Sequence, residues 1–313
     1  MSIRPFAVAI LFAVSVVGCG PKGLQPGEGY VDVPGGRVWY RIVGSGTATP
    51  LLVLHGGPGV PSYYLKPLAA LADERPVIFY DQLGCGHSDP ITDTTLLTVD
   101  HFVAELGAVR RALGLEEVHL LGHSWGTMLA TDYLLTKPTG VRSVIFASPA
   151  ISIPRWLADA DTLLLTMPDS IQKAVARHEA DGSFDAPEYQ AAVMAYYERY
   201  LARKLPWSAD VDSAFAQISE MVYGHMWGPS EFTATGTLRD YDRTGRLGEI
   251  TIPTLFTTGQ YDEARPETVE YYRSLVPGAE LAIIENAGHL TMQDDSAENV
   301  RVVREFLRRV ESR

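Results

Sequence analysis

The chain has 313 residues, of which 46% are hydrophobic and 20% are charged, the composition of a globular protein with a large core. It fits one α/β domain carrying an insertion, or two domains. The formal net charge of −12 argues against a nucleic-acid-binding protein, which would normally present a basic face, so we expect no nucleic-acid partner.

The N-terminal segment MSIRPFAVAILFAVSVVGCG has Arg4 as its only charged side chain. Its apolar stretch, residues 5–18, is short for a membrane-spanning helix and has the length of a signal-peptide core. Residues 16–19 (VVGC) resemble the lipobox of bacterial lipoproteins, in which the cysteine is lipidated. We therefore predict a signal peptide over 1–18, a lipid anchor on Cys19 and export to the bacterial cell envelope, on the periplasmic or outer-membrane face. A plain secretory signal is the alternative.

Beyond this segment the chain alternates between strand and helix patterns. A linker is predicted over 19–29, followed by a hairpin that turns at residues 34–36. Six apolar runs have the length of buried strands: PLLVLHGG, PVIFYD, EVHLLG, VRSVIFASP, TIPTLFTTG and AELAIIENAG. Helical spacing is found over about 63–72, 99–113, from Gly126 onward, 266–276 and 297–310. The alternation predicts an α/β fold whose mostly parallel sheet has helices on both faces.

Residues 151–248 interrupt this alternation, because strand patterns stop there. The segment is rich in Ala, Met, Tyr and Trp, and its apolar residues have helical spacing, as in EYQAAVMAYYERYLARK. We predict a helical cap, inserted after the sixth parallel-type strand into a core formed by 30–150 and 249–313. Most aromatic residues of the cap are expected in its own interior, and a minority should line a pocket.

The motif GHSWG places Ser124 between Gly122 and Gly126, where a predicted strand meets a predicted helix. This G-x-S-x-G pattern is that of a nucleophile elbow, a turn so tight that small residues are needed on both sides of the serine. The elbow presents the serine hydroxyl above the sheet and directs the backbone N–H of Trp125 toward an oxyanion. Because short G-x-S-x-G matches also occur by chance, the rest of the chain must supply the catalytic partners.

Two later loops supply an acid and a base in the chain order that a nucleophile elbow requires. A serine hydroxyl reacts only when a base takes its proton and a third group orients that base. Asp262 follows the strand TLFTTG, and His289 follows the strand LAIIENAG. Glu285 and Asp294 lie too near His289 in sequence to match the expected order well. We therefore predict a catalytic triad of Ser124, His289 and Asp262.

The segment LHGGPG, directly after a predicted strand, offers a second donor to the oxyanion. Glycine N–H groups carry no side chain nearby and can approach an oxyanion closely. Gly57 is the predicted partner of Trp125 in an oxyanion hole. His55, in the same segment, is expected to support the loop, and Asp81 is expected to organise the loop after the next strand.

Five motifs in this order, HGGPG, YDQLGCGHSD, GHSWG, GQYDE and AGH, resemble the proline iminopeptidases, a family of serine peptidases with the α/β-hydrolase fold. The resemblance extends from about residue 30 to the C-terminus and implies the same triad and oxyanion donors. GCG and MWGPSEFTATGTLRDYD are most similar to the branch that contains the archaeal tricorn-associated aminopeptidase. Leu83 replaces the family's commoner arginine, and His123 stands where many members have glycine, so the resemblance does not imply a strict preference for proline.

The resemblance also implies how a free amino terminus is bound. Glu231, in the cap segment GPSEF, and Glu263, next to Asp262, match the family's amine-binding pair. Carboxylates shielded from water provide both charge and acceptors for an ammonium group. The alternatives are a helix N-terminal acid for Glu231 and a surface carboxylate for Glu263. Tyr223 and Trp227 are candidate pocket residues, with the cap interior as their alternative.

Motifs and resemblance together predict a serine aminopeptidase that releases N-terminal proline, and other small or apolar residues, through an acyl-enzyme. The expected substrates are short peptides or amino-acid amides with a free N-terminus. No cofactor or metal is expected, because no cluster with metal-ligand spacing is visible. Cys85 lies in a loop without an elbow and is expected to pack. Two alternatives stay open: an esterase, amidase or lactonase with the same triad, and a non-catalytic binding lipoprotein. The oligomeric state is not predicted.

Overall fold

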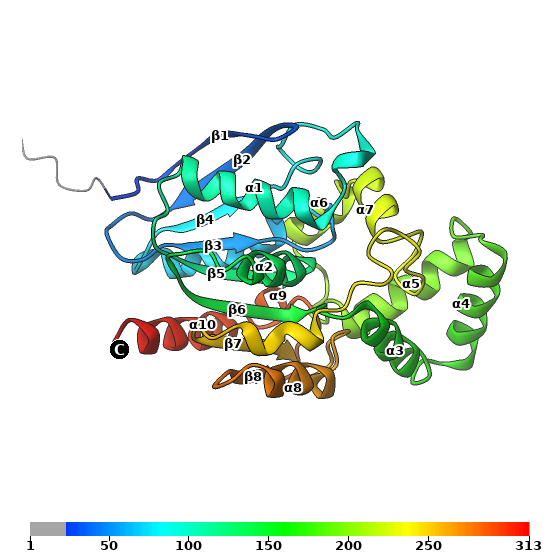
Figure 1. Cartoon of the computed structure of the whole chain (residues 1–313). Coiled ribbons are helices and arrows are strands. Elements are labelled where there is room, and N and C mark those ends of the chain that lie inside the picture. Colours follow the sequence, from blue (N-terminus) through cyan, green and yellow to red (C-terminus); the bar gives the residue numbers. More distant parts are fainter. Residues whose placement is uncertain (1–22, 313) are drawn as a thin grey trace, which may run out of the picture.

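The computed structural model of the chain describes residues 23–312, so the predicted signal peptide and Cys19 lie outside it. An eight-stranded sheet runs through the molecule in the order β1-β2-β4-β3-β5-β6-β7-β8 (Figure 1). Its strands are β1 (Gly27–Val33), β2 (Gly36–Val43), β3 (Leu51–Leu54), β4 (Val77–Tyr80), β5 (Val118–Ser124), β6 (Val141–Pro149), β7 (Thr254–Gly259) and β8 (Glu280–Ile284). Strands β3 to β8 pair in parallel, and β1 and β2 add an antiparallel edge beside β4. The predicted α/β fold is confirmed.

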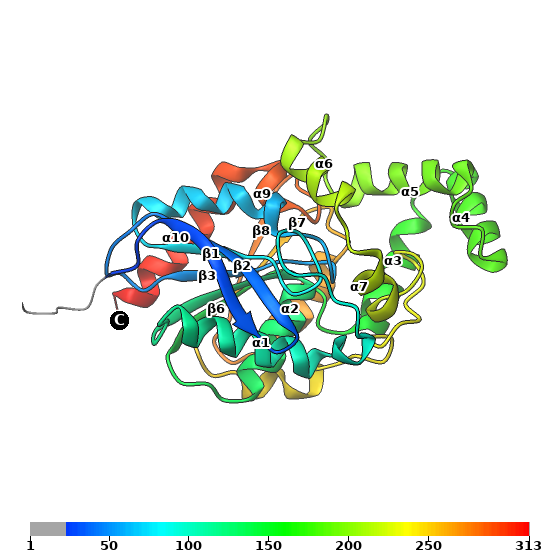
Figure 2. The same ribbon diagram turned by 90° about the horizontal axis from the view of Figure 1, so that it is seen from above.

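Helices lie on both faces of the sheet and beyond one of its ends (Figures 1 and 2). The α-helices are α1 (Val99–Ala112), α2 (Trp125–Leu135), α3 (Ile153–Leu164), α4 (Asp169–Asp181), α5 (Pro187–Tyr200), α6 (Ala209–Ala216), α7 (Glu220–Met226), α8 (Pro266–Leu275), α9 (Thr291–Asp294) and α10 (Ser296–Glu311). The 3-10 helices are η1 (Ser62–Asp73), η2 (Thr94–Leu96) and η3 (Thr244–Glu249). None of the helices within residues 23–312 is long and apolar enough to cross a membrane.

Two hydrophobic clusters cover the faces of the sheet, because side chains alternate along each strand. In β3, Leu52 and Leu54 belong to the cluster under α1, α2 and α8, whereas Leu51 and Val53 belong to the cluster under η1 and α10. All four side chains are fully buried. A strand that is apolar throughout is typical of a parallel sheet covered on both faces, which explains the continuous run LLVL in the sequence.

Helices α3 to α7 all lie between β6 and β7 in the chain. In both views α4 and α5 project beyond the end of the sheet (Figures 1 and 2). The predicted count of parallel strands before this insertion was wrong. β6 is the sixth strand of the chain but the fourth parallel one, because the hairpin β1–β2 is antiparallel.

Two predicted boundaries also differ from the structure. β1 begins at Gly27, inside the predicted linker over 19–29, because Gly27 and Glu28 already pair with Ile42 and Arg41 of β2. The helix predicted over about 63–72 is the 3-10 helix η1. Pro67 lies within it and has no N–H to donate, which disfavours a regular α-helical ladder there.

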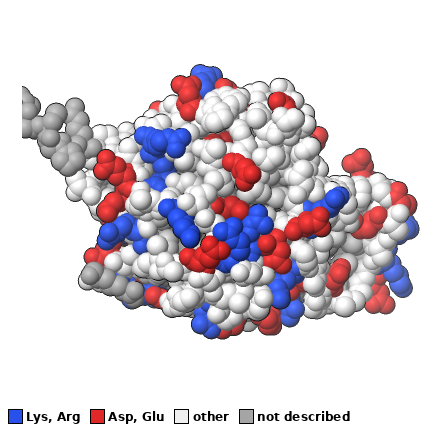
Figure 3. Space-filling model, in the orientation of Figure 1, with Lys and Arg blue, Asp and Glu red and all other residues white. Residues whose placement is uncertain are grey.

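Acidic and basic side chains are interspersed on the face of the molecule in Figure 3. Arg301 of α10 donates hydrogen bonds to the exposed carboxylates of Glu298 and Glu305. Arg75 is instead 2% exposed and donates to both carboxylate oxygens of Glu311, at 2.5 and 2.9 Å. This pair joins the end of η1 to the last turn of α10 and so holds the C-terminal helix against the sheet.

The parallel strands bring four loops to one edge of the sheet. β3, β5, β7 and β8 all end there, because parallel neighbours have their carboxyl ends on the same side. Such an edge is where open α/β sheets usually hold their ligands. The loops that follow these strands carry HGGPG, GHSWG, GQYDE and AGH.

Candidate active site

Ser124 is the last residue of β5 and directly precedes α2. Its backbone has φ 53° and ψ −121°, a conformation that side-chain-bearing residues seldom adopt. A Cβ on Gly122 would lie 2.3 Å from the carbonyl oxygen of Gly126, and one on Gly126 would lie 2.3 Å from that of Leu54. The strand therefore turns into the helix as a nucleophile elbow, and the two glycines are needed because the backbones touch.

His289 and Asp262 are brought together by the loops after β8 and β7. His289 Nδ1 lies 2.8 Å from Asp262 Oδ1, and both side chains are buried. Asp262 also accepts hydrogen bonds from the N–H groups of Gly259 (3.1 Å) and Ala264 (2.8 Å) and from the hydroxyl of Thr258 (3.0 Å). Burial alone would raise the pKa of Asp262, but His289 and the N–H of Gly259 hold it below its usual value. Because the carboxylate of Asp262 pairs with Nδ1 of His289, the Nε2 atom on the other side of the ring is left available as a base.

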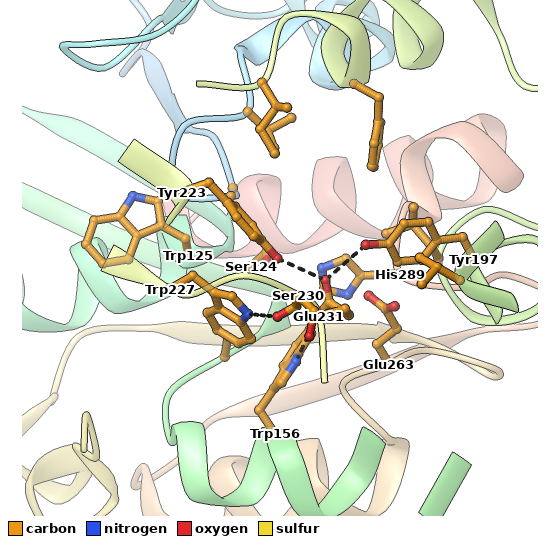
Figure 4. Close-up of a pocket in the computed structure, with 18 of the residues that line it drawn as sticks. Ser124, Trp125, Trp156, Tyr197, Tyr223, Trp227, Ser230, Glu231, Glu263 and His289 are labelled. Atoms are coloured by element: carbon orange, nitrogen blue, oxygen red, sulfur yellow. Dashed lines mark hydrogen bonds between the residues drawn. The ribbon is translucent and has the colours of Figure 1, made fainter. Parts of the chain in front are cut away.

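Ser124 and His289 line one cavity (Figure 4). Among the hydrogen bonds of residues 23–312, the Ser124 hydroxyl takes part in none. The serine–histidine contact is therefore the one part of the predicted triad that lacks a closed hydrogen bond. Contacts of this kind are often long in the free enzyme and shorten when substrate binds.

The predicted oxyanion donors also line this cavity. Trp125 is the first residue of α2. The first N–H groups of a helix have no acceptor within that helix, so the N–H of Trp125 is free to bind an oxyanion. Gly57 follows β3 with φ 107°, which favours glycine. His55 supports both: its Nε2 accepts from the backbone of Gln82 (2.9 Å), whose side chain accepts from the indole of Trp125 (2.8 Å).

The segment after β4 has the structural contacts expected of it. Asp81 is fully buried and accepts hydrogen bonds from the backbone and hydroxyl of Ser62 (2.9 and 2.7 Å). The Cys85 thiol donates to the Gln82 carbonyl, and burial raises its pKa well above the usual value. A thiol held in this way is a poor nucleophile.

The two predicted amine-binding glutamates line the same cavity, Glu231 from the predicted cap and Glu263 from the predicted core (Figure 4). Glu231 accepts hydrogen bonds from the indole of Trp156 (3.1 Å) and from the hydroxyls of Tyr197 and Tyr223 (both 3.3 Å). Glu263 is 3% exposed, and its Oε1 atom is buried without a hydrogen-bond partner among the described residues. The carboxylate of Glu231 is thus held by three donors, whereas Oε1 of Glu263 has no donor among the described residues.

Burial raises the pKa of both glutamates. For Glu263 the neighbouring carboxylates of Glu231 and Asp262 raise the pKa further, well above its usual range. For Glu231 the ring of His289 and the three donors act in the opposite direction. The pair is therefore asymmetric, because the pKa of Glu263 is raised further above its usual range than that of Glu231.

The cavity has a volume of about 240 Å³ and is mostly apolar. Tyr223 and Trp227 both line it, the latter with its indole donating to the Ser230 carbonyl at 2.8 Å. Within residues 23–312, no group of three or more His, Cys, Asp or Glu residues is arranged to hold a metal ion. The other apolar walls are formed by Val60, Met128, Val193, Leu201, Phe215, Ile218 and Leu290.

Two residues at the centre of this site were not predicted from the sequence. Trp156 of α3 donates to Glu231 and packs edge-on against the ring of His289, with centroids 5.3 Å apart. Tyr197 of α5 also donates to Glu231. Both lie in helical segments whose aromatic residues have no local pattern that separates pocket positions from interior ones.

Replacing the nucleophile or the acid tests the triad. Ser124→Ala should abolish labelling by a fluorophosphonate and hydrolysis of a p-nitrophenyl ester. Asp262→Asn should slow both by about 10³- to 10⁴-fold, because the amide cannot stabilise the imidazolium or keep Nε2 free of its proton. Glu285→Gln removes an exposed carboxylate near His289 and should retain the wild-type rates. An equal loss in Glu285→Gln would contradict the assignment of Asp262.

The chain is similar to proteins of known family. The family model for the alpha/beta hydrolase fold matches residues 49–296. A proline iminopeptidase of Heyndrickxia coagulans is 47% identical, over 90% of this chain and 98% of that protein, and one of Saccharolobus solfataricus is 37% identical, over 91% and 93%. The crystal structure of a Mycobacterium smegmatis proline iminopeptidase superposes with a TM-score of 0.85 at 34% identity, covering 91% of this chain and 98% of that one. The chain therefore belongs to the proline iminopeptidase family of α/β hydrolases.

Proposed function

We propose that the chain is a serine aminopeptidase that releases N-terminal proline, and other small or apolar residues, from peptides or amino-acid amides. The observation that carries this proposal is the glutamate pair beside Ser124 and His289. A buried carboxylate oxygen without a donor, as at Glu263, is costly unless a ligand supplies one. A protonated amino terminus supplies N–H donors and a compensating positive charge together.

In this proposal the amine lies against Glu231 and Glu263 and places the first carbonyl carbon beside Ser124. The Ser124 oxygen forms a bond to that carbon while its proton passes to Nε2 of His289. The N–H groups of Gly57 and Trp125 stabilise the oxyanion. His289 then gives the proton to the leaving nitrogen as the C–N bond breaks, and water, activated by the same base, hydrolyses the ester to Ser124.

The amine site joins the two predicted parts of the chain. Glu231 belongs to the cap over 151–248, and Glu263 belongs to the core formed by 30–150 and 249–313. The cavity between them is larger than a pyrrolidine ring, which favours a range of small and apolar first residues over proline alone. Membership of the archaeal branch stays a prediction.

Blocking the substrate amine tests the proposal most simply. Prolyl naphthylamide should be cleaved, and N-acetylprolyl naphthylamide should be cleaved at least about 100-fold more slowly, because acetylation removes the charge that the buried glutamates require. Alanyl and leucyl naphthylamides measure how broad the preference is. Equal cleavage of the acetylated substrate would indicate an esterase or amidase without an amine requirement. Failure to cleave any amide or ester would indicate a binding protein.

The asymmetry of the glutamates predicts a pH dependence of KM. Because the pKa of Glu263 is raised in the free enzyme, binding an ammonium group must displace a proton from this carboxyl. KM for prolyl naphthylamide should therefore fall as pH rises above the ordinary pKa range of a glutamate.

Glu263→Gln should raise KM and flatten this dependence, whereas Glu267→Gln, at an exposed position four residues away, should keep both. An unchanged slope in Glu263→Gln would contradict the proton displacement. If Glu267→Gln also changes the slope of KM against pH, the pH dependence would be assigned to surface charge.

We also propose that Cys19, outside the described residues, carries a lipid that anchors the enzyme to the cell envelope. The lipobox-like residues 16–19 support this proposal. Cys19→Ala should move the protein from the membrane fraction to the soluble one, and Cys85→Ala, at the only other cysteine, should not. Membrane association of Cys19→Ala equal to that of the wild type would contradict the anchor.

A further inference from the structure

A chain of buried hydrogen bonds joins the oxyanion loop to the base through the residue that precedes the nucleophile. The N–H of Gly56 donates to the hydroxyl oxygen of Tyr64 (2.8 Å), which lies 2.9 Å from Nδ1 of His123. Nε2 of His123 lies 3.0 Å from the backbone carbonyl oxygen of His289. His123 and Tyr64 are 1% and 2% exposed, so these contacts are largely shielded from bulk solvent.

Each donor and acceptor in this chain is determined by its partner. A carbonyl oxygen only accepts, so Nε2 of His123 must carry the hydrogen. Burial and the nearby His289 lower the pKa of His123 to about 3, so the ring is neutral and its Nδ1 accepts. The Tyr64 hydroxyl therefore donates to His123 and accepts from Gly56. The four groups form one directional series with no donor left over.

The surrounding packing leaves these groups little room to shift. The ring of His123 lies 4.7 Å from the ring of His289 and 5.2 Å from that of Tyr64, measured between centroids. A Cβ on Gly56 would lie 2.9 Å from the Tyr64 hydroxyl and 3.0 Å from Cβ of Ser124. The oxyanion loop, the elbow and the His289 loop therefore meet at His123.

His123 acts on a different part of the base from Asp262. Asp262 orients the imidazole ring through Nδ1, whereas His123 holds the peptide group of His289 through its carbonyl oxygen. Ser148 donates to the same oxygen at 2.9 Å. A displacement of this peptide would carry Nε2 of His289 away from Ser124, and small misplacements of reacting groups cost large factors in rate.

We propose that His123 is a positioning residue, which holds the base loop and the oxyanion loop at fixed places relative to Ser124. The inference rests on the roles given above to Ser124, His289 and Gly57. It does not depend on the amine site, since the two ring nitrogens of His123 bond to Tyr64 and His289 and to neither glutamate.

Two substitutions of His123 separate its hydrogen bond to Tyr64 from its hydrogen bond to His289. In His123→Gln the amide nitrogen can occupy the place of Nε2 and still donate to His289. In His123→Asn the amide oxygen can accept from Tyr64 near the place of Nδ1, but the side chain is too short to reach His289. His119→Asn is the matched control: His119 lies four residues earlier in β5, is fully buried, and has its ring bonded to Ser143 at 2.7 Å.

The rate of Ser124 labelling by a fluorophosphonate is the main measurement, made on the full chain, with kcat and KM for prolyl naphthylamide beside it. His123→Asn should lower the labelling rate and kcat about tenfold with KM unchanged, and His123→Gln should stay within about threefold of the wild type. His119→Asn should keep the wild-type rates.

Wild-type labelling of His123→Asn, or an equal loss in His119→Asn, would overturn the proposal. If His123→Asn does not fold, His123→Ser, whose side chain is also too short to reach His289, replaces it, and an unchanged labelling rate there overturns the proposal as well. A wild-type enzyme that is labelled at Ser124 but cleaves no prolyl amide contradicts the aminopeptidase function alone, because the labelling test of His123 needs no amine.

Discussion

The turn at Ser124 is the constraint on which the rest of the site depends. Its positive φ can persist only because the backbones of β3, β5 and α2 touch at Gly122 and Gly126, which fixes where the hydroxyl stands. From that point the parallel sheet determines the other positions, since the loops after β3, β7 and β8 end at the same edge. Catalytic groups from four distant segments therefore meet without any of them being close in sequence.

In the proposed function, the predicted cap contributes to the charge selectivity of the hydrolase centre. Glu231 comes from the cap and is fixed by Trp156, Tyr197 and Tyr223, whereas Glu263 comes from the core and has no such donors. Two buried carboxylates in one apolar cavity repel each other, which disfavours charge on both. A cation that enters between them would remove that cost, which is the electrostatic basis of the proposed amine requirement.

Residues at strand ends could be predicted from local motifs, whereas in the cap Glu231 was predicted only through the family resemblance and Trp156 and Tyr197 were not predicted. The run VRSVIFASP predicts a strand over the residues that form β6, and the glycine motifs identify the turns on which Ser124 and Gly57 lie. Tyr196 and Tyr197 illustrate why pocket residues of the cap could not be separated from interior ones by sequence pattern. They are adjacent tyrosines of α5, yet Tyr196 packs in the cap interior and Tyr197 donates to Glu231. Only the packing of α5 against the core decides between them, and that packing is not local.

The account is tested most directly by mass spectrometry of enzyme quenched during turnover of proline and N-acetylproline p-nitrophenyl esters. It predicts an adduct with the mass of one prolyl residue on the peptide that contains Ser124, formed from the proline ester and absent with the acetylated ester. An adduct on another residue, or equal adducts from both esters, would contradict a serine peptidase that selects a free amino terminus.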